Sequence, residues 1–262
     1  MRSTRTSSAC KNCQEIANQG LRHLAGATGM QCHVLGARQQ GIAAVAPGGH
    51  DRLALGIMWR PGIEPVPGTL RRIDGGPMWH NLISVALELG GHQITVATYH
   101  APPKAGRGTR RDEARLIAHW LTPASHGREI VLAGDWNSIS ARQLDGAYYD
   151  PDPNNTVTEA DLIRWGDDPP EIVYPTDRQP DQILAESGYL DLAVQTRAPW
   201  SPTTGHHPHD RNGPRRIDRI LHRLPDAEDA LACSVIGHRV HNTPLAYEAS
   251  DHFPVVATAR LP

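Results

Sequence analysis

The sequence has a single phenylalanine and only four cysteines among its 262 residues. Cysteine usage this sparse argues against a small fold that is held together by disulfides. No apolar run approaches the ~18 residues that a membrane-spanning helix needs, so we expect no membrane contact. The net charge is −2 with histidine neutral, so the chain lacks the overall basic field typical of nucleic-acid-binding proteins. A local basic groove remains compatible with that charge.

The N-terminal segment also lacks the features of a signal peptide. "MRSTRTSSACKNCQE" contains basic residues but no apolar core, so we expect a cytoplasmic protein by default. Cys10 and Cys13 have the C-x-x-C spacing of a zinc knuckle, but no second pair follows them. A Cys/His metal-binding protein that uses this pair and the 15 histidines is therefore the least favoured interpretation of the chain.

What the chain does have is turn-forming residues and an ordinary apolar content. Its 22 prolines and 24 glycines predict many short elements joined by defined turns. Apolar residues make up 39% and charged residues 21%, as in globular domains. No repeat or linker divides the sequence, so we predict a single domain over residues 1–262. Residues 148–180 are polar and proline-rich, which predicts a surface insertion with little regular structure.

Strands outnumber helices in the predicted secondary structure. Short apolar or β-branched runs predict strands at 52–61, 130–134, 215–223, 233–240 and 253–261. "LISVALELGGHQITVATYHAPP" predicts a hairpin that turns at Gly90 and Gly91. Residues 108–121 predict an amphipathic helix with Thr109 as its N-cap and Glu113 in its first turn. Because helices separate only some of the strands, the pattern favours a layered α/β fold with a mixed sheet.

Polar side chains lie at or near the ends of four predicted strands. They are His100 after "ITVATY", Asp135 and Asn137 after "IVLAG", Asp218 within "RIDRIL", and Asp251 and His252 before "FPVVATA". Each of them alone could be an ordinary turn or surface residue, and Asp218 could form an ion pair with a neighbouring arginine. Together they predict a functional site, because layered α/β folds gather functional residues at strand ends and in the adjoining loops.

Four of these segments resemble motifs of the endonuclease/exonuclease/phosphatase superfamily, the DNase I-like metal-dependent phosphoesterases. The segments are "ITVATYHAPP", "VLAGDWNS", "RRIDRIL" and "SDHFPVVA", in the order of the family. The resemblance extends from about Arg52 to the C-terminus. It implies a four-layer α/β sandwich of two mixed β-sheets flanked by helices. It also implies hydrolysis of a phosphate ester with Mg²⁺ or Mn²⁺ as cofactor.

The resemblance assigns a role to each residue of the predicted site. His252 would pair with Asp218 and activate the attacking water. Asp135 and Asn137 would position the nucleophile and the phosphate, or protonate the leaving group. His100 would contact the phosphate or act as a general acid.

The resemblance also implies metal ligands and substrate contacts. Glu15, in "NCQE", and Asp251 would hold the metal ion, with an ordinary acidic residue in a first helical turn as the less favoured interpretation of Glu15. The substrate contacts would come from the His- and Arg-rich segment that begins at Pro202, with a solvated loop as the equal alternative. The residues concerned are Arg215, Arg216 and His206.

One family feature is missing from the sequence. The family begins with a strand that carries an asparagine, whereas only fourteen mostly polar residues precede Glu15. We therefore expect the sandwich to lack its first strand, through a late start of the chain or a natural truncation. A truncated chain could be a non-catalytic binding module. No interleaving of aromatic and basic residues marks a nucleic-acid groove, so DNA, RNA and small phosphate esters all remain candidate substrates, with a nuclease slightly favoured.

Overall fold

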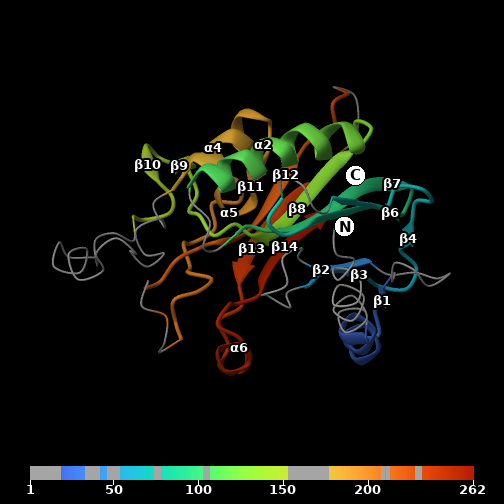
Figure 1. The fold of residues 1–262 in the computed structure, drawn as a ribbon, viewed down its shortest axis with the longest axis horizontal. Helices are drawn as coiled ribbons and strands as arrows, with labels where there is room; N and C mark the ends of the chain where they lie inside the picture. The colour runs from blue at the N-terminus through green and yellow to red at the C-terminus, as the bar shows by residue number, and fades with distance from the viewer. Residues whose placement is uncertain are drawn as a thin grey trace, which may run out of the picture.

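Figure 1 shows the chain, in a computed structural model, as stacked layers of helices and β-sheets. The structural statements below concern the residues that the structure describes. These are residues 19–32, 42–45, 54–73, 78–102, 107–152, 177–207, 210, 213–227 and 232–262.

A seven-stranded mixed sheet forms the centre of the molecule. Its strands are β4 (Glu64–Pro65), β5 (Arg71–Ile73), β6 (Leu82–Leu89), β7 (His92–His100), β8 (Glu129–Asp135), β11 (Leu190–Asp191) and β12 (Asp218–Arg223). The order is β11-β12-β8-β7-β6-β4, with β5 also paired to β6. Only β7 and β8 run parallel in this sheet. The predicted hairpin of β6 and β7 is confirmed, and its turn residues Gly90 and Gly91 have the positive φ angles that tight hairpins need.

Two helices, α2 (Arg107–Ala124) and α4 (Gln179–Glu186), cover one face of this sheet (Figure 1). Ala114, Ile117 and Leu121 of α2 are buried in one core with Ile130 and Leu132 of β8. The three helix residues recur every three to four positions, which is the spacing of one helical face. The alternate residues of β8 point to the same side of the sheet and meet that face. The apolar pattern of the sequence therefore fixes how α2 packs.

The start of α2 differs from the prediction. The helix begins at Arg107, so Thr109 is not its N-cap and Glu113 lies in the second turn. Glu113 is buried and accepts hydrogen bonds from the Tyr99 hydroxyl and from the backbone N–H of Trp79. The glutamate at this position is therefore explained by these tertiary hydrogen bonds and not by a favourable interaction with the helix N-terminus.

The other face of the central sheet is covered by further strands. The antiparallel pair β13 (Ser234–Val240) and β14 (Val255–Arg260) contacts β12. A three-stranded sheet, in the order β1-β3-β2, packs against β6 through Ile57 and Trp59. Its strands are β1 (Gln31–Cys32), β2 (Ile42–Val45) and β3 (Ala54–Trp59). The helical residues 19–28 lie outside this layer (Figure 1).

The predicted layered α/β architecture with a mixed sheet is thus confirmed. Residues 1–18 lie outside the described part of the chain, so the predicted lack of a first strand stays a prediction. Short elements complete the fold. They are the strand pair β9 (Gln143–Leu144) and β10 (Ala147–Tyr148), and the helices α5 (Leu192–Gln195) and α6 (Pro244–Ala249). Among the described residues, no helix combines the length and apolar character needed to cross a membrane.

The predicted surface insertion, residues 148–180, stays a prediction, because its centre, residues 153–176, lies outside the described residues. At its C-terminal end, α4 begins within it, and at both ends its side chains pack into the molecule. Asp150, Asp177 and Pro180 are all buried. Polar and proline-rich composition alone does not reveal these buried anchors.

Candidate active site

Three predicted site residues meet at one end of the central sheet. In the strand register, His100 of β7 lies beside Asp135 of β8, and Asp135 lies beside Asp218 of β12. Residues that are neighbours in register share a face of the sheet. His252, from the segment before β14, joins them. One carboxylate oxygen of each aspartate and one ring nitrogen of His252 lie within 4.8 Å of one another.

The glycine in "LAGDW" allows this arrangement. A Cβ atom added at Gly134 would lie 2.0 Å from the carbonyl oxygen of Tyr99 on the neighbouring strand. No side chain fits at that distance, so β7 and β8 can approach as they do only with glycine at this position. The next residue is Asp135, which is therefore placed by a tight strand pairing.

Asp218 and His252 form the central pair of the site. His252 Nδ1 lies 2.9 Å from Asp218 Oδ2. Thr203 supports both residues: its Oγ1 accepts hydrogen bonds from the backbone N–H groups of Ile217 and Asp218, at 3.1 and 3.0 Å. Its carbonyl oxygen accepts a hydrogen bond from the backbone N–H of Phe253, the residue after His252. Sequence reasoning missed Thr203, because a threonine in an irregular loop carries no signal for such contacts.

The charges at this site shift the pKa values of two residues. Burial, and then the charge of Asp218, raise the pKa of Asp135 to about 7. Burial alone would lower the pKa of His252, but its hydrogen bond to Asp218 and the charges of Asp218, Asp135 and Asp251 raise it to about 9. Asp135 and His252 therefore hold their protons at pH values where the isolated groups would not.

Asn137 is held beside Asp135 by a turn. Strand alternation would place both side chains on one side, whereas β8 ends at Asp135 and Asn137 has a φ of 43°. The backbone N–H of Asn137 donates to Asp135 Oδ1 at 2.9 Å, and its side-chain Nδ2 donates to the carbonyl oxygen of Ala101 at 2.9 Å. A hydrogen-bonded turn, rather than an extended strand, thus holds the amide. Trp136 between them is buried against Tyr99.

His100 also has a partner that the sequence did not indicate. Its Nε2 lies 3.5 Å from Asp135 Oδ2. The His80 ring stacks on the His100 ring, with centroids 4.4 Å apart and an interplanar angle of 13°. His80 is almost fully buried, so the stack restricts the orientation of the His100 ring. The spacing from His80 to His100 follows no motif, and only the register of β6 and β7 brings the rings together.

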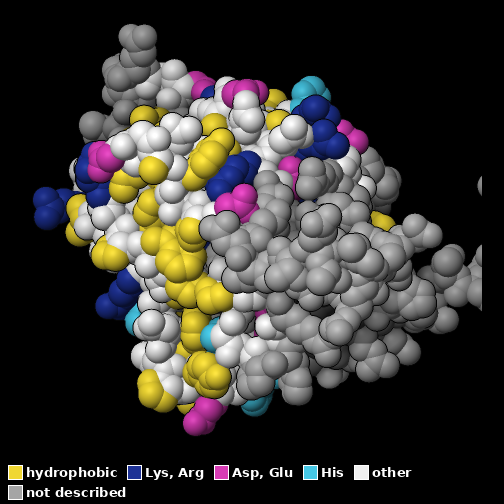
Figure 2. Space-filling model, turned by 90° about the vertical axis from the view of Figure 1, so that its left-hand side faces the viewer, with side chains coloured by type: hydrophobic (Ala, Val, Ile, Leu, Met, Phe, Trp, Pro, Cys, Tyr) yellow, Lys and Arg dark blue, Asp and Glu magenta, His cyan; other side chains and the backbone are white. Residues whose placement is uncertain are grey.

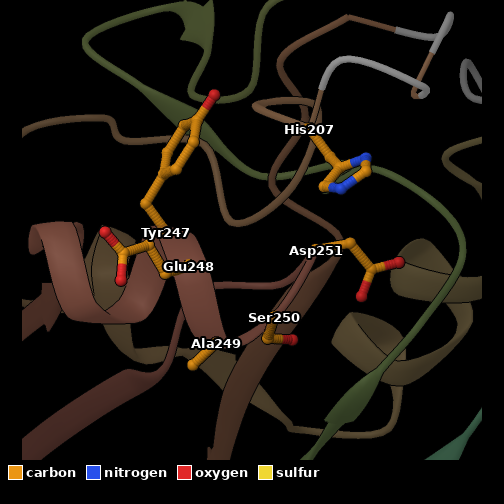
Figure 3. A pocket seen from close by; sticks show the side chains of 6 residues that line it. All are labelled: His207, Tyr247, Glu248, Ala249, Ser250 and Asp251. Atoms are coloured by element: carbon orange, nitrogen blue, oxygen red, sulfur yellow. The ribbon is translucent and has the colours of Figure 1, made fainter.

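Of the two predicted metal ligands, only Asp251 can be located, because Glu15 lies outside the described residues. Asp251 is exposed and lines a pocket of about 510 Å³ beside the Asp218–His252 pair (Figure 3). The His207 ring and the Asp251 carboxylate lie on one side of this pocket, and Tyr247 lies on the other. The remaining lining residues are Glu248, Ala249 and Ser250.

Two of the three predicted substrate contacts lie near the pair. Arg215 forms a 2.6 Å ion pair with Asp210, and its backbone pairs with Thr204, which in turn pairs with His252. The His206 ring stacks on the Phe253 ring at a centroid distance of 3.7 Å. Both positions adjoin the site, and their substrate contacts stay a prediction.

Arg216 requires a correction. Its side chain is 1% exposed, and it pairs with Asp150 and Asp191 at 2.7 Å each. Successive residues of an extended segment point in opposite directions, so Arg216 points into the protein while Arg215 remains near the site. The alternative ion pair of Asp218 with a neighbouring arginine is likewise wrong, because Arg219 pairs with Asp181.

The described surface on one side of the molecule shows no large basic patch. Figure 2 looks at the side that lies on the left in Figure 1. Hydrophobic side chains form a band down this face, and the Arg, Asp and Glu side chains are scattered around it. Any recognition of a charged substrate by the described residues of this face therefore depends on individual side chains rather than on a broad positive field.

The stacked sheets, the flanking helices and the His–Asp–Asp cluster at the strand ends define a DNase I-like α/β protein. The model of the endonuclease/exonuclease/phosphatase family matches residues 14–252. The chain therefore belongs to this family, which confirms the resemblance found in its motifs.

Solved structures of similar fold cover nearly the whole chain. An endonuclease/exonuclease/phosphatase from Bacteroides vulgatus superposes with a TM-score of 0.60 at 15% identity, over 97% of this chain and 90% of that one. A mannosyl-6-phosphatase from Bacteroides thetaiotaomicron gives 0.56 at 14% identity, over 97% and 90%. TDP2 from D. rerio, complexed with a single-strand DNA product, gives 0.55 at 15% identity, over 96% and 91%. No curated protein sequence matched the chain significantly. Identities this low establish the common fold alone.

Proposed function

We propose that this protein hydrolyses a phosphodiester with the help of a divalent cation, and that the Asp218–His252 pair activates the attacking water. The observation that carries this proposal is the 2.9 Å contact between His252 Nδ1 and Asp218 Oδ2, next to the partly buried carboxylate of Asp135. A carboxylate on Nδ1 orients the ring and leaves Nε2 to take the proton from water. The neutral ring is the active base, so the pair should work better as the pH rises towards the pKa of His252.

The acidic residues fit a hard divalent cation such as Mg²⁺ or Mn²⁺. Carboxylate oxygens are the ligands that such ions prefer, and one carboxylate oxygen of Asp135 and one of Asp218 lie within 4.8 Å of each other at the site. Asp251 and, by family resemblance, Glu15 would hold the ion. When bound, it would stabilise the negative charge on the phosphate oxygens.

The remaining side chains account for the leaving group and for substrate position. With a pKa of about 7, Asp135 is partly protonated at neutral pH and can donate a proton to the leaving oxygen. His100, stacked on His80, can contact the same phosphate. Asn137 is held in place by two hydrogen bonds, which suits an amide that orients a phosphoryl group.

The fold relatives leave two substrate classes to compare. One relative is a mannosyl-6-phosphatase, and another was solved with a single-strand DNA product. We favour a phosphodiester of the nucleic-acid type as the substrate. The alternative is a binding module of the same fold without catalytic activity.

The test is Mg²⁺-dependent cleavage of plasmid DNA and of bis(p-nitrophenyl) phosphate by the full chain. We expect turnover of at least one substrate, abolished by chelation and strongly reduced in His252→Ala and in Asp135→Asn. His23→Ala, an exposed histidine in the helical residues 19–28, is the matched control and should retain activity. No turnover of either substrate, or turnover that is unchanged in both site variants, would contradict the proposal and favour the binding module.

A further inference from the structure

The strands that carry the active site carry a second polar cluster at their opposite ends. His92 is the first residue of β7, Glu129 is the first residue of β8, and His222 lies near the end of β12. Cys233 immediately precedes β13. Glu129 and Asp135 are six residues apart on one strand, which corresponds to about 20 Å at ~3.3 Å per residue. The second cluster is therefore separate from the active site.

Strand alternation puts both clusters on the same face of the sheet. Residues separated by an even number of positions on a strand point the same way. Glu129 is six residues before Asp135, and His222 is four residues after Asp218. The face in question is the one opposite α2, because Ile130 and Leu132, the alternate residues of β8, are packed in the core with that helix. The cluster therefore faces the layer to which β13 belongs, from which Cys233 joins it.

Glu129 is the centre of the second cluster. Its side chain is fully buried, and its two oxygens face different histidines: Oε2 lies 2.8 Å from His92 Nε2, and Oε1 lies 2.5 Å from His222 Nε2. The backbone N–H of Cys233 also donates to both oxygens, at 3.2 and 3.0 Å. The ligand atoms of His92, Glu129 and Cys233 all lie within 4.8 Å of one another. An imidazole, a carboxylate and a thiol thus converge on one point.

We propose that His92 Nε2, the Glu129 carboxylate and Cys233 Sγ bind a Zn²⁺ ion, with His222 holding the other oxygen of Glu129. A buried ion pair between glutamate and histidine needs no thiol, whereas a set of sulfur, nitrogen and oxygen ligands is typical of protein zinc sites. Tetrahedral zinc with ligand bonds of about 2.0–2.3 Å requires ligand atoms less than ~4 Å apart. The existing separations reach this geometry with small side-chain movements.

The surroundings of the cluster support a metal site in two further ways. Ligating carboxylates are normally fixed by a hydrogen bond on their other oxygen, and His222, which is 1% exposed, supplies it here. His92 is the accessible member, with 17% of its side chain exposed, so it provides a route for the ion and a side from which water can complete the coordination. The thiol loses its proton on binding. A thiolate and an imidazole select zinc over magnesium, so this site would not compete for the hard cation of the active site.

Cobalt absorption of the full chain tests the proposal. Co²⁺ reports on zinc sites, because a thiolate ligand produces a ligand-to-metal charge-transfer band in the near ultraviolet. We expect one equivalent of Co²⁺ to produce this band in the natural chain, Zn²⁺ to abolish it by displacement, and excess Mg²⁺ to leave it unchanged. A folded natural chain that shows no such band, or a band removed by Mg²⁺, would overturn the proposal.

Variants identify the ligands. Cys233→Ser should remove the charge-transfer band, and His92→Gln, a change at the accessible end of the site, should weaken Co²⁺ binding at least tenfold. The double variant Cys10→Ser with Cys13→Ser is the matched control and should keep the band. Circular dichroism establishes that each variant is folded. A band that persists in Cys233→Ser, or one that is lost only in the double variant, would assign the metal to the C-x-x-C pair and refute the proposed site.

Discussion

Replacement of Arg216 by methionine tests whether this residue is structural, as its burial indicates. Arg216 is 1% exposed; its Nε lies 2.7 Å from Asp150 Oδ1, and its Nη2 lies 2.7 Å from Asp191 Oδ2. A third contact, from Nη1 to Asp191 Oδ1 at 3.2 Å, makes the pair with Asp191 two-pronged. Methionine fills a similar volume but leaves both carboxylates buried without the cation.

The expected loss of stability follows from those two carboxylates. Removing one partner of a buried ion pair costs about 3–5 kcal/mol, because the remaining charge is left uncompensated. Each carboxylate keeps one backbone donor, since Asp150 accepts from the N–H of Ser140 and Asp191 accepts from that of Ala193. We therefore expect the free energy of unfolding to fall by about 4 kcal/mol. This value is near the middle of the range, although two carboxylates lose their partner. With a urea slope of about 3 kcal/mol per molar, the unfolding midpoint should fall by about 1.3 M.

Urea unfolding, followed by circular dichroism at neutral pH, measures this change. The adjacent Arg215→Met variant is the control: a single, less deeply buried pair with Asp210 predicts a loss of about 1 kcal/mol together with a raised KM. A midpoint for Arg216→Met within about 0.3 M of the natural chain's, corresponding to ~1 kcal/mol, would refute the structural role. A raised KM with unchanged stability in Arg216→Met would instead support the original prediction that Arg216 contacts the substrate.

Three further substitutions test the active site and its scaffold. Asp218→Asn should lower kcat for phosphodiester cleavage by about 10²–10⁴-fold, because His252 loses the carboxylate that orients it; an unchanged kcat would contradict the pairing. Gly134→Ala would place a Cβ 2.0 Å from the Tyr99 carbonyl oxygen, so we expect little folded protein by circular dichroism, and a natural melting temperature would disprove the required close approach. The folded pKa of Asp135, about 7 against 3.8 for the free group, means that its contribution to the stability of the metal-free protein is present below pH ~4 and lost as the pH rises through ~7. Asp135→Asn should therefore raise the melting temperature at pH 8 more than at pH 5, and equal effects at both would contradict the shifted pKa.

The positions of the main site residues could be predicted because strand ends are visible in the sequence. His100, Asp135 and Asp218 each terminate or begin an apolar run, and the register of β7, β8 and β12 then places them side by side. The roles proposed for these residues come from the resemblance to the family motifs. What the sequence could not show is how loops support the site: Thr203 holds the backbone of Asp218 through a contact that no periodicity encodes.

Arg216 illustrates the second limit of sequence reasoning. Its partners Asp150 and Asp191 are 66 and 25 residues away in the chain. A basic residue next to a strand that carries candidate site residues is as compatible with substrate binding as with a buried ion pair until the fold is known. The direction of the side chain decides between these two roles. That direction depends on the residue at which the extended segment begins. A shift of one residue would exchange the environments of Arg215 and Arg216.

Strand alternation places a carboxylate on the same face of the sheet at each end of β8. The sequence "EIVLAGD" reads as a buried apolar run that delivers Asp135, yet only Ile130 and Leu132 face the helical side and are fully buried there. The opposite face begins with Glu129 and ends with Asp135. The two carboxylates lie about 20 Å apart and share none of the hydrogen-bonding side chains described above. Substitutions at one end should therefore add to those at the other within about 0.5 kcal/mol of unfolding free energy. Paired variants such as His92→Gln with Asp135→Asn would reveal any coupling that the shared strand transmits.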